Sequence, residues 1–116
     1  MPMTLMEAMA RQEGFLVPGS LPQRRNNPGD VEEGRFAREH GALATDGHRF
    51  AAWPTPEAGW AAMRALLVEG YVGLTVAQAL DKWAPPEEND DGAYLRDVLE
   101  WTGLRADTIL SPENIG

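Results

Sequence analysis

Residues 13–30 have the sequence EGFLVPGSLPQRRNNPGD, and the rest of the chain is organised around this stretch. It starts with Glu13, which we expect at the end of a helix, and continues as a loop rich in proline, glycine, arginine and asparagine. Residues 26–29 are a strong turn signal, because asparagine side chains bond to nearby backbone, proline presets φ and glycine accepts a positive φ. A carboxylate before such a polar loop can act as a general acid, so Glu13 is our first candidate for acid–base chemistry.

The residues before this stretch predict a helix of about 10–12 residues. Thr4 and Glu7 form a capping-box pattern at its start, and Gly14 is suited to end it. Glu13 then lies in the last turn, where the negative end of the helix dipole and burial in a cleft would both raise its pKa. A glutamate that must hold a proton near neutral pH needs such help. An ordinary exposed glutamate fits the same position, and from position alone it is the more frequent case.

The second half of the chain alternates helix signals with breakers. Each predicted helix starts at a residue suited to be an N-cap and ends near glycine or proline. The predicted N-caps are Thr55, Thr75 and either Asp90 or Asp91. The predicted helices cover residues 55–69, 75–84 and 91–102, and a short terminal helix is expected around Ile109 and Leu110.

The remaining segment, residues 30–53, predicts a small hairpin. Two short strand-like pieces, 30–36 and 47–53, are separated by a polar loop over 37–46. With 116 residues, the chain is expected to form a single domain over its whole length. The expected fold class is therefore mainly α, with a small β-hairpin or an irregular β region.

The charge of the chain restricts its partners. A formal net charge of −8 disfavours nucleic-acid binding, because phosphate contacts need clustered cations. No apolar run reaches the roughly 20 residues that a membrane-spanning helix needs. The N-terminal MPMTLMEAMARQEGF has neither the basic nor the apolar region of a secretion signal. We therefore expect a protein that is made soluble in the cytoplasm without a signal peptide, and action on a cell wall would require another delivery route.

The residue content also argues against a metal or another cofactor. The chain has no cysteine and two histidines, so thiolate and histidine-rich zinc sites are not expected. The glycine motifs that bind phosphates and dinucleotides are absent, and the acidic run 87–91 lacks the spacing of an EF-hand calcium loop. What remains is acid chemistry at Glu13, with amides, guanidinium groups and aromatic rings nearby, which is the chemistry used on glycans.

The order of motifs resembles that of a known family. Q-E-G-F at the end of the first helix is followed by R-R-N-N-P-G, G-H-R-F-A, T-P-E-A-G-W-A-A, K-W-A-P-P-E-E-N-D and A-Y-L. This order is similar to that of the small lysozyme-like domains of phage virions and prophages, which are related to lytic transglycosylases and lysozymes. The match covers residues 9–103, and its most specific pieces are 25–29 and 83–90.

The resemblance implies a lysozyme-like helical domain that binds peptidoglycan or a related amino-sugar polymer in its groove. Glu13 matches the catalytic acid of the family, and Tyr94 matches a tyrosine that faces this acid from a late helix. The residues implied to bind the substrate are Arg25, Asn26, Asn27, Asp30, Phe50 and Asn89. Delivery to the cell wall by a virion or a lysis system, with other virion proteins as partners, follows from the same resemblance.

The residues leave the mechanism open. A transglycosylase needs one carboxyl group, whereas a hydrolase needs a second carboxylate, for which Asp30 and Asp46 are the candidates. Relatives tend to have asparagine where this chain has Asp30. A catalytically inactive virion or glycan-binding protein with the same fold is the alternative to an enzyme. Whether His48 or Arg49 reaches the cleft is also open, and a surface position is the default for both.

Overall fold

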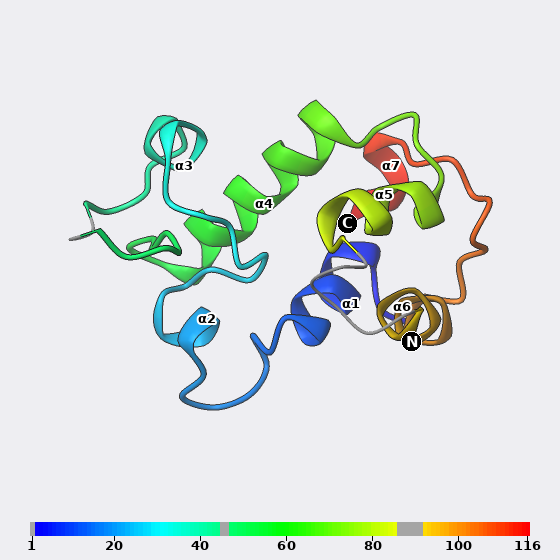
Figure 1. Cartoon of the computed structure of the whole chain (residues 1–116), viewed down its shortest axis with the longest axis horizontal. Helices are drawn as coiled ribbons and strands as arrows, with labels where there is room; N and C mark the ends of the chain where they lie inside the picture. Colours follow the sequence, from blue (N-terminus) through cyan, green and yellow to red (C-terminus); the bar gives the residue numbers. More distant parts are fainter. Residues whose placement is uncertain (1, 45–46, 86–91) are drawn as a thin grey trace.

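The computed structural model describes residues 2–44, 47–85 and 92–116. In this part of the chain all longer regular elements are helices, which confirms the mainly α class (Figure 1). They are α1 (Leu5–Gln12), α2 (Leu21–Arg24), α3 (Arg35–Glu39), α4 (Pro56–Gly70), α5 (Val76–Trp83), α6 (Ala93–Thr102) and α7 (Pro112–Ile115). Among these described residues, no helix is both long enough and apolar enough to cross a membrane.

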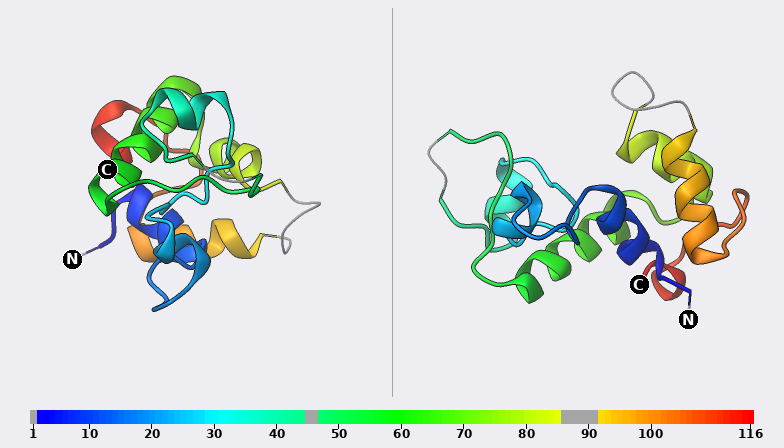
Figure 2. Two further views of the ribbon diagram at one scale, coloured as in Figure 1. Left: turned by 90° about the vertical axis from the view of Figure 1, so that its left-hand side faces the viewer. Right: turned by 90° about the horizontal axis from the view of Figure 1, so that it is seen from below.

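Helix α4 runs between two hydrophobic clusters (Figures 1 and 2). The larger cluster gathers α1, α5, α6 and α7 at one end of α4, where α1 packs against α6 and α7, and α5 packs against α6. Leu66 and Trp83 contact both clusters, so they join the two ends of the molecule. The smaller cluster consists of Val31, Ala37, Ala51, Trp53 and Ala62.

The starts of three helices follow their sequence signals. Thr4, Thr55 and Thr75 are N-caps as predicted, and each side chain accepts a hydrogen bond from the backbone N–H three residues later. Such a cap satisfies one of the amide groups that a helix start leaves without an intrahelical partner. The predicted caps of α6, Asp90 and Asp91, lie outside the described residues.

The predicted β region is irregular, and its described residues, 30–44 and 47–53, form no regular hairpin. Its two segments meet at an isolated antiparallel bridge between Glu32 and Phe50, next to a hydrogen bond of 2.9 Å from the Ala51 N–H to the Val31 carbonyl. Helix α3 takes up part of the predicted strand and loop. The strand propensity of this segment is weak, and the helical turn buries Ala37 in the smaller hydrophobic cluster.

Two short helices also differ from the prediction. Helix α2 lies in a segment predicted as loop, with the Ser20 side chain as its N-cap. Helix α7 starts after Ser111, whereas Ile109 and Leu110, which were predicted to be helical, come before it. The Leu110 N–H donates to the Leu74 carbonyl at 2.8 Å. This pairing buries Leu110 against the connection between α4 and α5, and burial outweighs local helix propensity.

Candidate functional site

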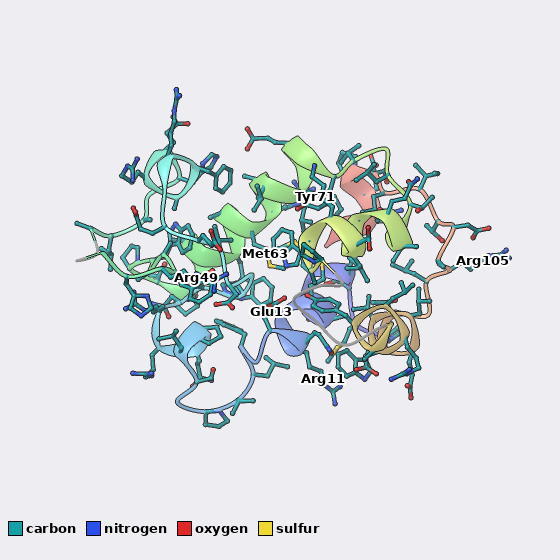
Figure 3. All side chains as sticks on the ribbon, viewed as in Figure 1. Arg11, Glu13, Arg49, Met63, Tyr71 and Arg105 are labelled. Atoms are coloured by element: carbon teal, nitrogen blue, oxygen red, sulfur yellow. The ribbon has the colours of Figure 1, made fainter. Side chains whose placement is uncertain are left out.

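The described residues form a cleft with a volume of about 500 Å³. It lies where the end of α1 meets the turn after residue 28, the segment around residue 50 and the end of α5. Figure 3 labels Glu13 and Arg49, which come from opposite sides of this cleft. The lining residues are Glu13, Gly29, Asp30, Val31, Glu32, Arg49, Phe50, Leu66, Trp83 and Ala84.

Glu13 caps the C-terminal end of α1, which is shorter than predicted. Its backbone N–H still donates to the Met9 carbonyl at 3.0 Å, so the helix sets the direction of its side chain. Gly14 follows with φ of 90°, a left-handed conformation that glycine adopts readily. The chain therefore turns away directly after Glu13 and leaves its carboxylate at the cleft.

One side chain from another helix donates a hydrogen bond to the Glu13 carboxylate, and a second shares the cleft lining with it. The Tyr94 hydroxyl on α6 donates to Oε2 at 2.8 Å, and Trp83 at the end of α5 lines the same cleft. The Tyr94 hydroxyl is farther, at 3.4 Å, from the Met9 carbonyl oxygen. The structure thus brings Glu13 and Tyr94 together, as the family resemblance implied, and it adds Trp83.

The pKa of Glu13 is raised above its usual value. Burial is the largest cause, because desolvation disfavours the charged carboxylate. The hydrogen bond from Tyr94 lowers the pKa, the negative charge of Asp30 raises it, and the nearby Trp83 side chain lowers it. Glu13 therefore holds its proton to a higher pH than an exposed glutamate, and the Tyr94 hydroxyl remains as a donor to the carboxylate once the proton has left.

The Tyr94 hydroxyl keeps its proton in this environment. Tyr94 is 7% exposed, and its pKa is raised well above the usual range by burial and then by the negative charge of Glu13. A neutral phenol has one proton to donate. Tyr94 therefore acts as a hydrogen-bond donor to Glu13, and proton transfer from its own hydroxyl is disfavoured.

Trp83 is held in place by close packing. A Cβ atom on Gly29 would lie 3.0 Å from the Trp83 ring and 3.0 Å from the Met63 side chain, so only glycine fits there without displacing a neighbour. The Trp83 ring also meets Tyr71 edge-on, with 5.5 Å between ring centroids. The sequence placed Trp83 in the K-W-A-P-P-E-E-N-D motif, but the motif alone could not assign it to the site.

Asp30 shares the cleft with Glu13. Its φ is 52°, a left-handed conformation in which asparagine and aspartate are over-represented. This explains why either residue type fits the position. Burial is the largest cause that raises the pKa of Asp30; the charge of Arg49 lowers it and that of Glu32 raises it.

The two asparagines of the turn hold the cleft wall together. Asn27 is 1% exposed, and its Nδ2 donates to the carbonyls of Val31 and Ala51, both at 2.9 Å. Its Oδ1 accepts from the Val31 N–H at 2.9 Å, while the Asn26 Nδ2 donates to the Trp53 carbonyl at 3.0 Å. Both amides bind backbone and so shape the cleft wall, and the buried Asn27 is not presented to a ligand.

Of the other residues predicted to bind substrate, one lines the cleft and one lies behind its wall. Phe50 lines the cleft. Arg25 lies behind this wall and donates from Nη1 to the Phe50 carbonyl at 3.2 Å. Asn89, and Asp46 as a second-carboxylate candidate, lie outside the described residues.

Two charged cleft residues were not assigned from the sequence. Glu32 and Arg49 both line the cleft, although a surface position was the default for Arg49. The antiparallel bridge between Glu32 and Phe50 brings them together, and a pairing register between segments 17 residues apart is not visible in local sequence patterns.

The fold and the site together define a mainly α protein with a cleft that is lined by a glutamate of raised pKa. Comparisons with models of protein families, with curated proteins and with solved structures each find no match to this chain. Its function is therefore inferred from its own residues and geometry.

Proposed function

We propose that this protein is a lysozyme-like enzyme that cleaves the bond between N-acetylmuramic acid and N-acetylglucosamine in peptidoglycan, with Glu13 as general acid and base. The observation that carries the proposal is the Glu13 carboxyl group, which lies in a cleft and holds its proton to raised pH. The Tyr94 hydroxyl fixes its orientation through the 2.8 Å hydrogen bond. The motif resemblance at residues 25–29 and 83–90 points to the same substrate.

The reaction that fits this arrangement best is a lytic transglycosylation. Protonated Glu13 gives its proton to the glycosidic oxygen as the bond to the sugar breaks. The resulting Glu13 carboxylate then takes the proton of the 6-hydroxyl of the same muramic acid, whose oxygen closes an anhydro ring on the anomeric carbon. No water is consumed, and Glu13 ends as it began. The hydrogen bond from Tyr94 stabilises the carboxylate between the two steps.

Hydrolysis is a second candidate because Asp30 lies in the same cleft. A retaining hydrolase uses a second carboxylate at roughly 5–5.5 Å from the acid, and an inverting one at roughly 6.5–9.5 Å. Asp30 raises the pKa of Glu13 through its charge, so the two carboxyl groups influence each other.

The experiment that tests the proposal is digestion of purified peptidoglycan sacculi, with products identified by mass. Anhydro-muropeptides identify a transglycosylase, and muropeptides with a reducing end identify a hydrolase. Absence of both products between about pH 4 and pH 8, where a raised glutamate pKa matters, would contradict an enzyme. It would favour an inactive lysozyme-like component of a virion.

The net charge of −8 bears on delivery. An acidic protein has no long-range attraction to an anionic cell wall. We therefore propose that it reaches its substrate as part of a virion or lysis system, with other virion proteins as partners.

An Asp30→Asn variant separates the two chemistries. For a transglycosylase we expect cleavage within about tenfold of the parent, with the alkaline limb of the pH profile at lower pH. The reason is that the charge of Asp30 raises the pKa of Glu13, so its removal lets Glu13 lose its proton earlier. Initial rates on sacculi over a pH series measure this, with Asp81→Asn on the exposed face of α5 as control. A loss of several orders of magnitude would instead assign a hydrolase.

A Tyr94→Phe variant should keep the fold, because the ring volume is conserved. We expect turnover to fall by about 10- to 100-fold, since a hydrogen bond to a charged group contributes roughly 1.5–3 kcal/mol. The hydrogen bond lowers the pKa of Glu13, so its loss should move the alkaline limb of the pH profile to higher pH. Rates and pH profiles on sacculi measure both effects. Unchanged turnover would remove Tyr94 from the site.

A further inference from the structure

We infer that Arg49 recognises a carboxylate group on the glycan, so that the cleft takes an acidic amino-sugar strand in preference to a neutral one. This inference rests on the proposed glycan-cleaving function and names the class of its substrate. The carboxylate can be that of a muramic acid or of a peptide attached to it. A guanidinium group binds such a group through two parallel N–H donors.

The charges that line the cleft explain why an acidic ligand would need Arg49. The described lining residues include three carboxyl groups, those of Glu13, Asp30 and Glu32, and Arg49 is the one cation among them. The chain as a whole carries a formal net charge of −8. Within this cleft the three carboxyl groups oppose an acidic ligand, and Arg49 is the lining side chain that can attract one.

Arg49 is held in a fixed position on the cleft wall. Its Nε and Nη2 atoms donate to Oε1 of Glu32 at 3.2 and 3.1 Å, and its Cζ lies 4.9 Å from the centroid of the Phe50 ring. Its side chain remains 65% exposed, and its bonds to Glu32 use Nε and Nη2, so that they do not occupy Nη1. An exposed ion pair adds little to stability, but it orients the guanidinium before a ligand arrives.

A simpler role for Arg49 would be to neutralise its own neighbours. Its charge does lower the pKa of Asp30, and it pairs with Glu32. These two roles predict different ligand selectivity. Recognition requires that the effect of Arg49 depend on a carboxylate of the ligand, whereas neutralisation acts equally on acidic and neutral ligands.

The test measures binding by calorimetry to the full chain carrying Glu13→Gln, so that no ligand is consumed. The probes are an alternating strand of N-acetylglucosamine and N-acetylmuramic acid with free carboxylates, and the same strand with each carboxylate converted to a methylamide. Adding Arg49→Gln should weaken binding of the acidic strand about tenfold and change that of the amidated strand less than twofold. Arg49→Lys should retain part of the preference, because the charge stays and the paired donors are lost.

Two further variants separate recognition of the ligand carboxylate from other effects of charge. Arg38→Gln is the matched control, because Arg38 is a similarly exposed arginine that pairs with Glu33 and does not line the cleft; it should leave both affinities unchanged. Glu32→Gln should strengthen binding of the acidic strand, since it removes a negative charge and a competitor for the guanidinium. The preference for the acidic strand should fall as salt is raised.

The possible outcomes separate this inference from the proposed function. If Arg49→Gln weakens the binding of both strands equally, or if the parent binds both strands with equal affinity, the recognition role is overturned and the glycan function is left intact. If neither strand binds to the Glu13→Gln parent, both the recognition role and the proposed function are overturned. Selective loss of the acidic strand, with Arg38→Gln unchanged, supports the inference.

Discussion

A Glu13→Gln variant should lose glycan cleavage by about two to four orders of magnitude while it keeps its fold. The amide has the shape of the carboxyl group but cannot give a proton to the glycosidic oxygen or take one from the attacking hydroxyl. Its remaining carbonyl oxygen can still accept the hydrogen bond from Tyr94, which now ends on Oε2 at 2.8 Å. Product release from sacculi, read by mass, measures the loss. Glu100→Gln on the exposed face of α6 is the control.

The stability of the same variant provides an independent check. A carboxyl group whose pKa is raised on folding binds its proton more tightly in the native state. Its contribution to stability is therefore lost as the pH rises from the usual glutamate pKa through the raised one. Glu13→Gln should remove this decline, and its unfolding free energy at pH 7 should lie within about 1 kcal/mol of the parent. A large loss of stability with little loss of cleavage would assign Glu13 a structural role.

A Gly59→Ala variant should be destabilised by about 3 kcal/mol or more. Gly59 lies in α4 where the turn after α2 crosses the helix, and a Cβ atom there would overlap the carbonyl oxygen of Asn26. It would also lie 3.0 Å from Cδ of Pro28. The overlapping atoms are backbone and a proline ring, which cannot turn aside as a flexible side chain can. The turn that positions Asp30 must therefore shift as a unit.

Urea unfolding measures the effect, with Gly70→Ala in the same helix as control. A Cβ atom on Gly70 would lie no closer than 3.6 Å to its nearest neighbour, the Nζ atom of Lys82. Alanine there should leave stability unchanged or raise it by up to about 1 kcal/mol. If both variants unfolded at the same urea concentration, the close contact between α4 and the turn would be refuted.

The sequence predicted well where structure is decided within a few residues. Thr4, Thr55 and Thr75 cap helices because each side chain bonds an amide three residues away. Prediction from neighbouring residues failed where a segment distant in sequence pairs with the backbone. Leu110 was predicted to be helical, yet it lies outside any helix, because its amide pairs with Leu74 and its side chain is buried.

The turn over residues 26–29 shows why residue type alone could not assign roles. Asparagines in a polar loop suggest groups that bind sugar hydroxyls, and the same pattern also suits a loop that is held by its own side chains. The second use applies to Asn27, whose amide reaches the backbone of Ala51 across 24 residues of sequence. Gly59 is a similar case, because its need for glycine arises from Asn26 and Pro28 on a different element.

The sequence by itself determined the mainly α class, three of the helix caps and Glu13 as a candidate acid, because these depend on composition and on neighbours within one helical turn. Only the tertiary structure decided that Tyr94 donates to Glu13, and that Trp83 and Asp30 share its cleft. The physical reason is that the pKa of Glu13 is raised mainly by exclusion of water. Water is excluded by α5, α6 and the turn around Gly29, which are separate in sequence and meet only in the folded chain.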